Sequence, residues 1–215
     1  MIKQWHENIK KTGSKIVSDF EDFVGGLQRY TTSVKIINII GKIQSGKTEV
    51  MQYVAGALNR STSGSPHRLF YSITYPNIEL FDQFKNDMKS FPNVITIKLT
   101  TMLRNGDMEA YKRLKQRIEQ SISFGNVLFL GIDESEFRVG ANSILDKLLK
   151  QIFNDYPHLR VYIMFVGATP SSLRSLENDT HIPIQNFHLL QHLKYLYFLH
   201  LHILKLHLKE FLMNL

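Results

Sequence analysis

Eight residues near the start of the chain have the types and spacing of a phosphate-binding loop. The pattern G-x-x-x-x-G-K-[ST] is matched in full by Gly41-Lys42-Ile43-Gln44-Ser45-Gly46-Lys47-Thr48. The glycines allow successive backbone N–H groups to curl around a phosphate, and a helix beginning near Lys47 would point its positive end at the same place. We expect all eight residues to bind ATP, with Lys47 on the β- and γ-phosphates and the Thr48 hydroxyl on Mg²⁺. The alternative is an ordinary glycine-rich turn between a strand and a helix.

A pair of acids follows an apolar run later in the chain. Val127–Ile132 has the composition of a central strand and ends in Asp133 and Glu134. Asp133 is expected to hold Mg²⁺, directly or through water, and Glu134 to polarise the water that attacks the γ-phosphate. Strand ends of a parallel sheet converge on one edge, so these acids can share a site with the phosphate loop. The alternative is two solvated acids at a strand end.

A third element has small residues where an apolar run ends. Val161–Val166 is followed by Gly167-Ala168-Thr169-Pro170. Thr169 is expected to share a hydrogen bond with the acidic pair and to report the state of the γ-phosphate. The alternative is an ordinary turn bounded by glycine and proline.

Elements that alternate along the chain must position these residues. Short apolar runs predict five strands, and runs with three- and four-residue spacing predict four helices. The strands are 34–40, 68–74, 93–99, 126–132 and 161–166, and the helices are 47–59, 77–90, 107–123 and 142–155. This alternation predicts an α/β fold with a mostly parallel sheet of five or more strands and helices on both faces.

The chain divides into three parts by composition. Residues 1–30 form a polar lead-in, with a short helix or two around Ile9 to Phe23 that ends at the Gly25-Gly26 pair. Residues 31–178 form the ATP-binding domain, and residues 179–215 form an atypical tail rich in leucine and histidine. We expect the tail to pack on the sheet or on a partner. The other hypothesis is that translation in a shifted reading frame produced it.

Charge and composition narrow the class of protein. The 215 residues include 26 Lys+Arg and 19 Asp+Glu, a formal charge of +7, which favours a polyanion such as nucleic acid as partner. There is no cysteine, which excludes disulfides, a thiol nucleophile and a cysteine-ligated zinc site. The N-terminus lacks a secretory pattern, and lysines and histidines interrupt the apolar tail. We therefore expect an intracellular protein, cytoplasmic or nuclear, with no membrane span.

Taken in order, the segments GKIQSGKT, LGIDESE and VGATP resemble three motifs of superfamily 2 helicases and related DNA translocases. The resemblance covers about residues 30 to 175 and implies the first RecA-like motor domain of a P-loop NTPase. It implies that Lys47 and Thr48 bind nucleotide and magnesium, that Asp133 binds magnesium and that Glu134 activates water. It also implies that Thr169 couples hydrolysis to movement.

Two looser similarities accompany these motifs. Thr74-Tyr75-Pro76-Asn77, with Leu80 and Gln83 after it, is similar to the helicase segment that contacts the nucleic-acid backbone. Gln28, preceded by Phe23, lies where some members read adenine, although the pairing can also be incidental. The expected partner is nucleic acid, with DNA ahead of RNA.

Helicases of this type close nucleotide between two motor domains, and the second supplies an arginine to the transition state. The 40 residues after Ser175 are too few for such a domain. We expect the chain to bind ATP, to hydrolyse it weakly alone and to need a second chain. The rival families are a viral or phage DNA-packaging ATPase of the terminase type, whose nuclease domain is absent from the sequence, and a non-catalytic remnant that binds nucleotide or nucleic acid.

Overall fold

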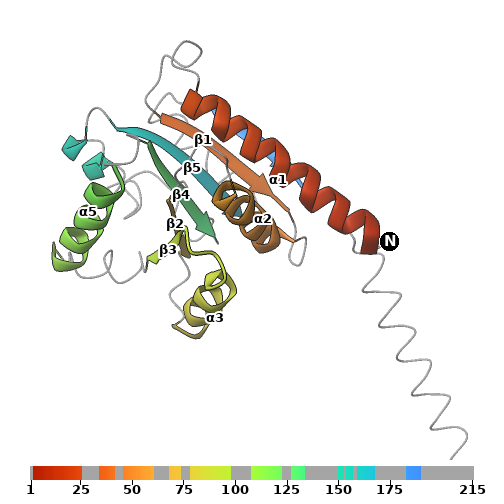
Figure 1. The fold of residues 1–215 in the computed structure, drawn as a ribbon, viewed down its shortest axis with the longest axis horizontal. Coiled ribbons are helices and arrows are strands. Elements are labelled where there is room, and N and C mark those ends of the chain that lie inside the picture. The colour runs from red at the N-terminus through yellow and green to blue at the C-terminus, as the bar shows by residue number, and fades with distance from the viewer. Residues whose placement is uncertain are drawn as a thin grey trace, which may run out of the picture.

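Six described strands form one sheet in the computed structural model (Figure 1). The described residues are 2–25, 34–41, 46–60, 68–73, 78–97, 108–122, 127–133, 150–152, 154–156, 159–167 and 183–189. The strands are β1 (Val34–Ile40), β2 (Leu69–Ile73), β3 (Val94–Ile97), β4 (Val127–Asp133), β5 (Arg160–Gly167) and β6 (Ile184–His188). Their order across the sheet is β3-β2-β4-β5-β1-β6, and every described pair is parallel. The predicted α/β class is confirmed.

The described helices cover both faces of this sheet. They are α1 (Ile2–Gly25), α2 (Lys47–Asn59), α3 (Ile78–Met88) and α5 (Met108–Ile122). Side chains of α1, α2 and α3 share one core with alternate strand residues such as Phe129. Side chains of α5 share the core on the opposite face with the intervening strand residues, such as Leu128. Burial on both faces explains why the central strands read as unbroken apolar runs.

The sixth strand was not expected from the sequence. β6 lies within residues 179–215, which the composition marks as a tail, and it pairs in parallel with β1 along Ile36–Ile40. The buried side chain of Asn38 in β1 donates a 3.2 Å hydrogen bond to the Asn186 side chain in β6. This pair favours one register, because sliding β6 by one residue would turn Asn186 to the other face. Residues 190–215 lie outside the described part of the chain.

The N-terminal segment is one continuous helix of 24 residues, where the sequence predicted a short helix or two. α1 ends at Gly25, as the glycine pair indicated. Ile16, Phe20 and Phe23, spaced four and three residues apart, are almost fully buried against the sheet. The helix is therefore part of the hydrophobic core.

Polar contacts fix the C-terminal half of α1 on the sheet. The Arg160 guanidinium donates to the backbone carbonyls of Phe23 and Val24 at 3.1 and 2.7 Å. A cation at these carbonyls stabilises the negative end of the helix. One turn earlier, the Asp19 carboxylate pairs with Lys35 and accepts a 2.8 Å hydrogen bond from Tyr162. These contacts fix the direction of α1 along the sheet and so the position of its N-terminal half.

Gly131 in β4 leaves room for the ring of Tyr71 in β2. A Cβ atom at position 131 would lie 2.6 Å from Tyr71 Cδ1 and 3.2 Å from the methyl carbon of Met51 in α2. Both neighbours are fully buried. We expect Gly131→Ala to lower the free energy of unfolding by about 1–3 kcal/mol, the usual cost of overpacking a core. Urea unfolding monitored by circular dichroism measures this.

The matched control is Gly25→Ala at the end of α1. An added Cβ there meets nothing within 4 Å. We expect its urea midpoint to stay close to that of the wild type. Equal midpoints for Gly131→Ala and Gly25→Ala would show that the Tyr71 ring accommodates the extra methyl group.

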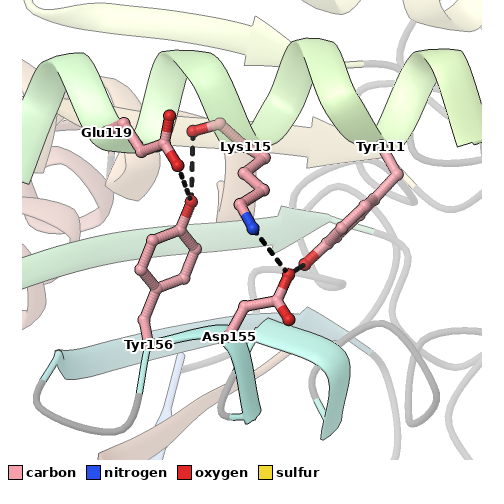
Figure 2. Close-up of polar contacts among 5 residues, drawn as sticks. All are labelled: Tyr111, Lys115, Glu119, Asp155 and Tyr156. Atoms are coloured by element: carbon pink, nitrogen blue, oxygen red, sulfur yellow. Dashed lines mark hydrogen bonds and ion pairs between the residues drawn. The ribbon is translucent and has the colours of Figure 1, made fainter.

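A polar cluster joins α5 to the residues just before β5 (Figure 2). The Asp155 carboxylate accepts hydrogen bonds from the Tyr111 hydroxyl at 2.7 Å and from Lys115 at 3.3 Å. The Tyr156 hydroxyl donates to Glu119 at 3.1 Å. Hydrogen bonding from Tyr111, with a smaller contribution from Lys115, lowers the pKa of Asp155 below its ordinary range, and burial raises the pKa of Tyr156.

Acid should remove the stabilising effect of Asp155. Because its pKa is lowered in the folded state, the carboxylate contributes stability above its unfolded pKa, near pH 4, and that contribution disappears as pH falls through the lower folded value. We expect Asp155→Asn to melt below the wild type at pH 7 and the difference in melting temperature to be smaller at pH 3. A difference that is the same at both pH values would contradict this role.

Candidate functional site

Gly46 begins helix α2 in a backbone conformation that favours glycine. Its φ is +87°, in the left-handed region, and its carbonyl accepts the first helical hydrogen bond from the Val50 N–H at 3.1 Å. The next two residues, Lys47 and Thr48, form the first turn of α2. The glycine therefore directs the chain from the loop into the helix, so that the helix N-terminus points back at the loop.

Helix α1 packs against the same glycine. A Cβ atom at Gly46 would lie 2.7 Å from Ile9 Cδ1 and 3.0 Å from Trp5 Cζ2. Residue 46 thus needs glycine for two reasons, its φ angle and the close approach of α1. The sequence pattern indicated the first reason and gave no sign of the second.

Lys47 reaches back across the loop to its first residue. The Lys47 Nζ donates a 3.2 Å hydrogen bond to the carbonyl of Gly41. The N–H of Gly41 in turn donates to the carbonyl of Gly167, at the end of β5, at 3.4 Å. The amine therefore lies beside Gly41, the first residue of the loop that the sequence assigns to phosphates, and this residue is joined to β5.

Thr48 and Asp133 lie side by side, although they are 85 positions apart. The Thr48 hydroxyl donates a 3.2 Å hydrogen bond to Asp133 Oδ2, and Asp133 is only 5% exposed. Adjacent ligands of an octahedral Mg²⁺ ion, each about 2.1 Å from the metal, lie about 3 Å apart. One hydroxyl and one carboxylate oxygen at this separation fit two neighbouring positions of such an ion, and phosphate and water oxygens are the usual remaining ligands.

The sheet register explains why these residues meet. Ile39 of β1, Val166 of β5 and Asp133 of β4 are at one level across the sheet. One residue further, Ile40 pairs with Gly167. β5 lies between β1 and β4. Its carboxyl end is therefore next to both Ile40, which precedes the phosphate loop, and Asp133.

Two buried hydrogen bonds hold helix α2 in place beneath this edge. The Tyr71 hydroxyl donates to the carbonyl of Met51 at 3.1 Å, and the Asn93 side chain donates to the carbonyl of Ala55 at 3.1 Å. Burial raises the pKa of Tyr71 far above its ordinary value. The phenol therefore stays protonated and remains a donor, which fixes α2 and the residues at its N-terminus.

The structure brings together five of the residues that the sequence singled out: Gly41, Gly46, Lys47, Thr48 and Asp133. The other predicted site residues, Lys42, Ile43, Gln44, Ser45, Glu134 and Thr169, lie outside the described part of the chain. Their places in the sequence put Glu134 directly after Asp133 and Thr169 two residues after Gly167.

The structure describes only part of the two looser similarities, because Gln28 and residues 74–77 both lie outside the described residues. Phe23 is 1% exposed, beneath the Arg160 guanidinium and beside Tyr162, so its ring is part of the core and not free to stack on a base. Leu80 and Gln83 both lie exposed on α3, which follows the carboxyl end of β2.

Comparisons with known proteins report a likeness in fold. No protein-family model matches the sequence, and no similar protein is found among curated ones. A solved structure named "ATPase" matches with a TM-score of 0.43 and 13% identity, over 74% of this chain and 67% of that chain. Within the described residues, none of the helices is both long enough and apolar enough to cross a bilayer.

Proposed function

We propose that the chain is the ATP-binding domain of a nucleic-acid-dependent ATPase, the first motor domain of a helicase or translocase. The observation that carries this proposal is the contact between Asp133 and Thr48, next in sequence to Lys47, which bonds to Gly41. A hydroxyl, a carboxylate and an amine converge at the carboxyl edge of a parallel sheet, where ligands of open α/β folds bind. This set matches the needs of a nucleotide triphosphate with Mg²⁺.

Different residues of the chain bind the phosphates, hold the metal and activate water in the proposed hydrolysis of ATP. Backbone N–H groups of the loop and the Lys47 amine would bind the phosphates, and Thr48 and Asp133 would hold Mg²⁺, which would neutralise charge on the phosphate oxygens. Glu134 orients a water and accepts its proton. The water oxygen bonds to the γ-phosphorus as the bond from that phosphorus to the β–γ bridging oxygen breaks, so that ADP and phosphate leave.

Nucleic acid would lie along the same edge of the sheet. Ile73, the last residue of β2, is level with Asp133, and the exposed Leu80 and Gln83 lie on the helix that follows. A polynucleotide on this surface would be close to the hydrolysis site, and Thr169 would transmit the state of the nucleotide. A second motor domain would supply the arginine and the opening and closing movement.

ATP turnover with and without nucleic acid tests this function. We expect slow hydrolysis by the chain alone and stimulation by single- or double-stranded DNA or by RNA. Lys47→Ala should abolish turnover because it removes phosphate contacts. Glu134→Gln should abolish turnover and leave MgATP binding intact, since it removes only the group that accepts the proton.

Other results would favour the rival functions. Tight MgATP binding without turnover under every condition indicates a non-catalytic nucleotide-binding protein. A nuclease domain encoded immediately downstream indicates a DNA-packaging ATPase. Unstimulated turnover that survives Glu134→Gln contradicts the proposed mechanism.

A further inference from the structure

A polar pocket of about 260 Å³ lies between α1 and the edge strand β6. Helix α1 contributes Asn8, Lys11, Thr12 and Lys15, whose spacing of three and four residues places them on one face of the helix. Strand β6 contributes Asn186–His188. No carboxylate is among these described lining residues, so the pocket suits a polar or anionic group.

Residues next to both walls of the pocket contact Ile40 and Gly46, which lie at the two ends of the phosphate loop. Asn8 directly precedes Ile9, the residue that packs on Gly46. His188 is level with Ile40, and the next residue's N–H, at position 189, donates to the Ile40 carbonyl at 2.8 Å. The pocket therefore lies one residue away from the contact of Ile9 with Gly46 and from the hydrogen bond to the Ile40 carbonyl.

The strand order gives the direction of a bound nucleotide. The magnesium ligands Thr48 and Asp133 lie toward β4, so the γ-phosphate end points to that side of β1. β6 flanks β1 on the opposite side. A nucleotide extended along the loop would direct its ribose and base toward β6 and α1, where the pocket lies.

The size and chemistry of the pocket fit that part of the molecule. A volume of about 260 Å³ lies just below the range of about 300–1,000 Å³ for sites that enclose a whole drug-sized ligand. Asn8 and Thr12, both half-buried, offer an amide and a hydroxyl that can pair with a base edge or ribose hydroxyls. Phe187, half-buried on the α1 face of the sheet, offers an aromatic ring.

We propose that this pocket, between α1 and β6, binds the nucleoside part of the nucleotide whose phosphates the loop holds. The inference rests on the proposed nucleotide-binding function and assigns the base and ribose to residues that no motif includes.

Calorimetric binding of two magnesium complexes tests this assignment. MgATP carries a nucleoside, and magnesium tripolyphosphate presents a chain of phosphates alone. We expect the double variant Asn8→Ala, Thr12→Val to bind MgATP roughly tenfold to thirtyfold more weakly, as the loss of two hydrogen bonds predicts. Its affinity for tripolyphosphate should match the wild type, which also shows that the loop remains folded. Ser18→Ala, at an exposed α1 position outside the pocket, is the matched control.

Several results would overturn the proposal. Unchanged MgATP affinity in the double variant, or an equal loss for both complexes, shows that the pocket does not hold the nucleoside. Unchanged MgATP affinity together with weaker binding of a single-stranded oligonucleotide makes the pocket a nucleic-acid site instead. If the wild type binds neither complex, or Lys47→Ala weakens neither, the proposed nucleotide-binding function fails and this inference with it.

Discussion

Replacing Lys47 with alanine is expected to weaken MgATP binding by about a hundredfold or more. The Lys47 amine lies 3.2 Å from the carbonyl of Gly41, the first residue of the proposed phosphate loop. Two hydrogen bonds from an ammonium group to phosphate contribute about 1.5–3 kcal/mol each, and 1.4 kcal/mol corresponds to a factor of ten in affinity. Titration with a fluorescent ATP analogue in the presence of Mg²⁺ measures the loss.

The control for Lys47→Ala removes a lysine elsewhere. Lys85 lies exposed on α3, so Lys85→Ala lowers the net charge by the same amount without touching the loop. We expect it to bind MgATP as the wild type does. Thermal melting of both variants should show similar stability. An equal loss of affinity in the two variants would mean that Lys47 acts only through general charge.

Replacing Asp133 with asparagine is expected to remove most of the effect of Mg²⁺ on nucleotide binding. Asparagine has almost the same shape and can still accept the Thr48 hydrogen bond, but it lacks the negative charge that attracts the metal. We expect the wild type to bind ATP at least about tenfold more tightly with Mg²⁺ than with EDTA, which corresponds to about 1.4 kcal/mol. In the variant the two affinities should be nearly equal.

Two further variants show whether the Asp133 effect is specific. Asp155→Asn also removes one carboxylate, but in the polar cluster that joins α5 to the residues just before β5, and should keep the full magnesium dependence (Figure 2). Thr48→Val removes the neighbouring hydroxyl and should reduce the dependence as Asp133→Asn does. If Asp133→Asn retains the wild-type response to Mg²⁺, the acid does not hold the metal.

Residues of the sheet and its first crossover helix were predictable because local signals agree there. Val34–Ile40 and Lys47–Asn59 have the predicted bounds, and the other four predicted strands are found within two residues at each end. Strands buried on both faces must be apolar throughout, and the loop between β1 and α2 must contain glycine. The contact between Thr48 and Asp133 follows from these elements, since parallel strands end at one edge.

The unpredicted features depend on contacts between distant segments. β6 is a short edge strand in which no side chain is fully buried, and Gln185, Asn186 and His188 give it little apolar signal. Its place is fixed by β1, including the Asn38 side chain 148 positions earlier in the chain. The pocket on α1 was missed for the same reason. Asn8 and Thr12 look like solvated helix residues until β6 supplies the opposite wall.

The packing of α1 on Gly46 gives the protein a built-in optical probe. Trp5 is the single tryptophan of the chain, and its ring lies next to the phosphate-loop glycine. Indole emission depends on the polarity and rigidity of its surroundings, and here all of that emission comes from one position beside the loop. The far end of α1 is held by Arg160. The tryptophan therefore lies at a fixed position beside Gly46. We expect its emission spectrum to change when nucleotide binds, without any attached label.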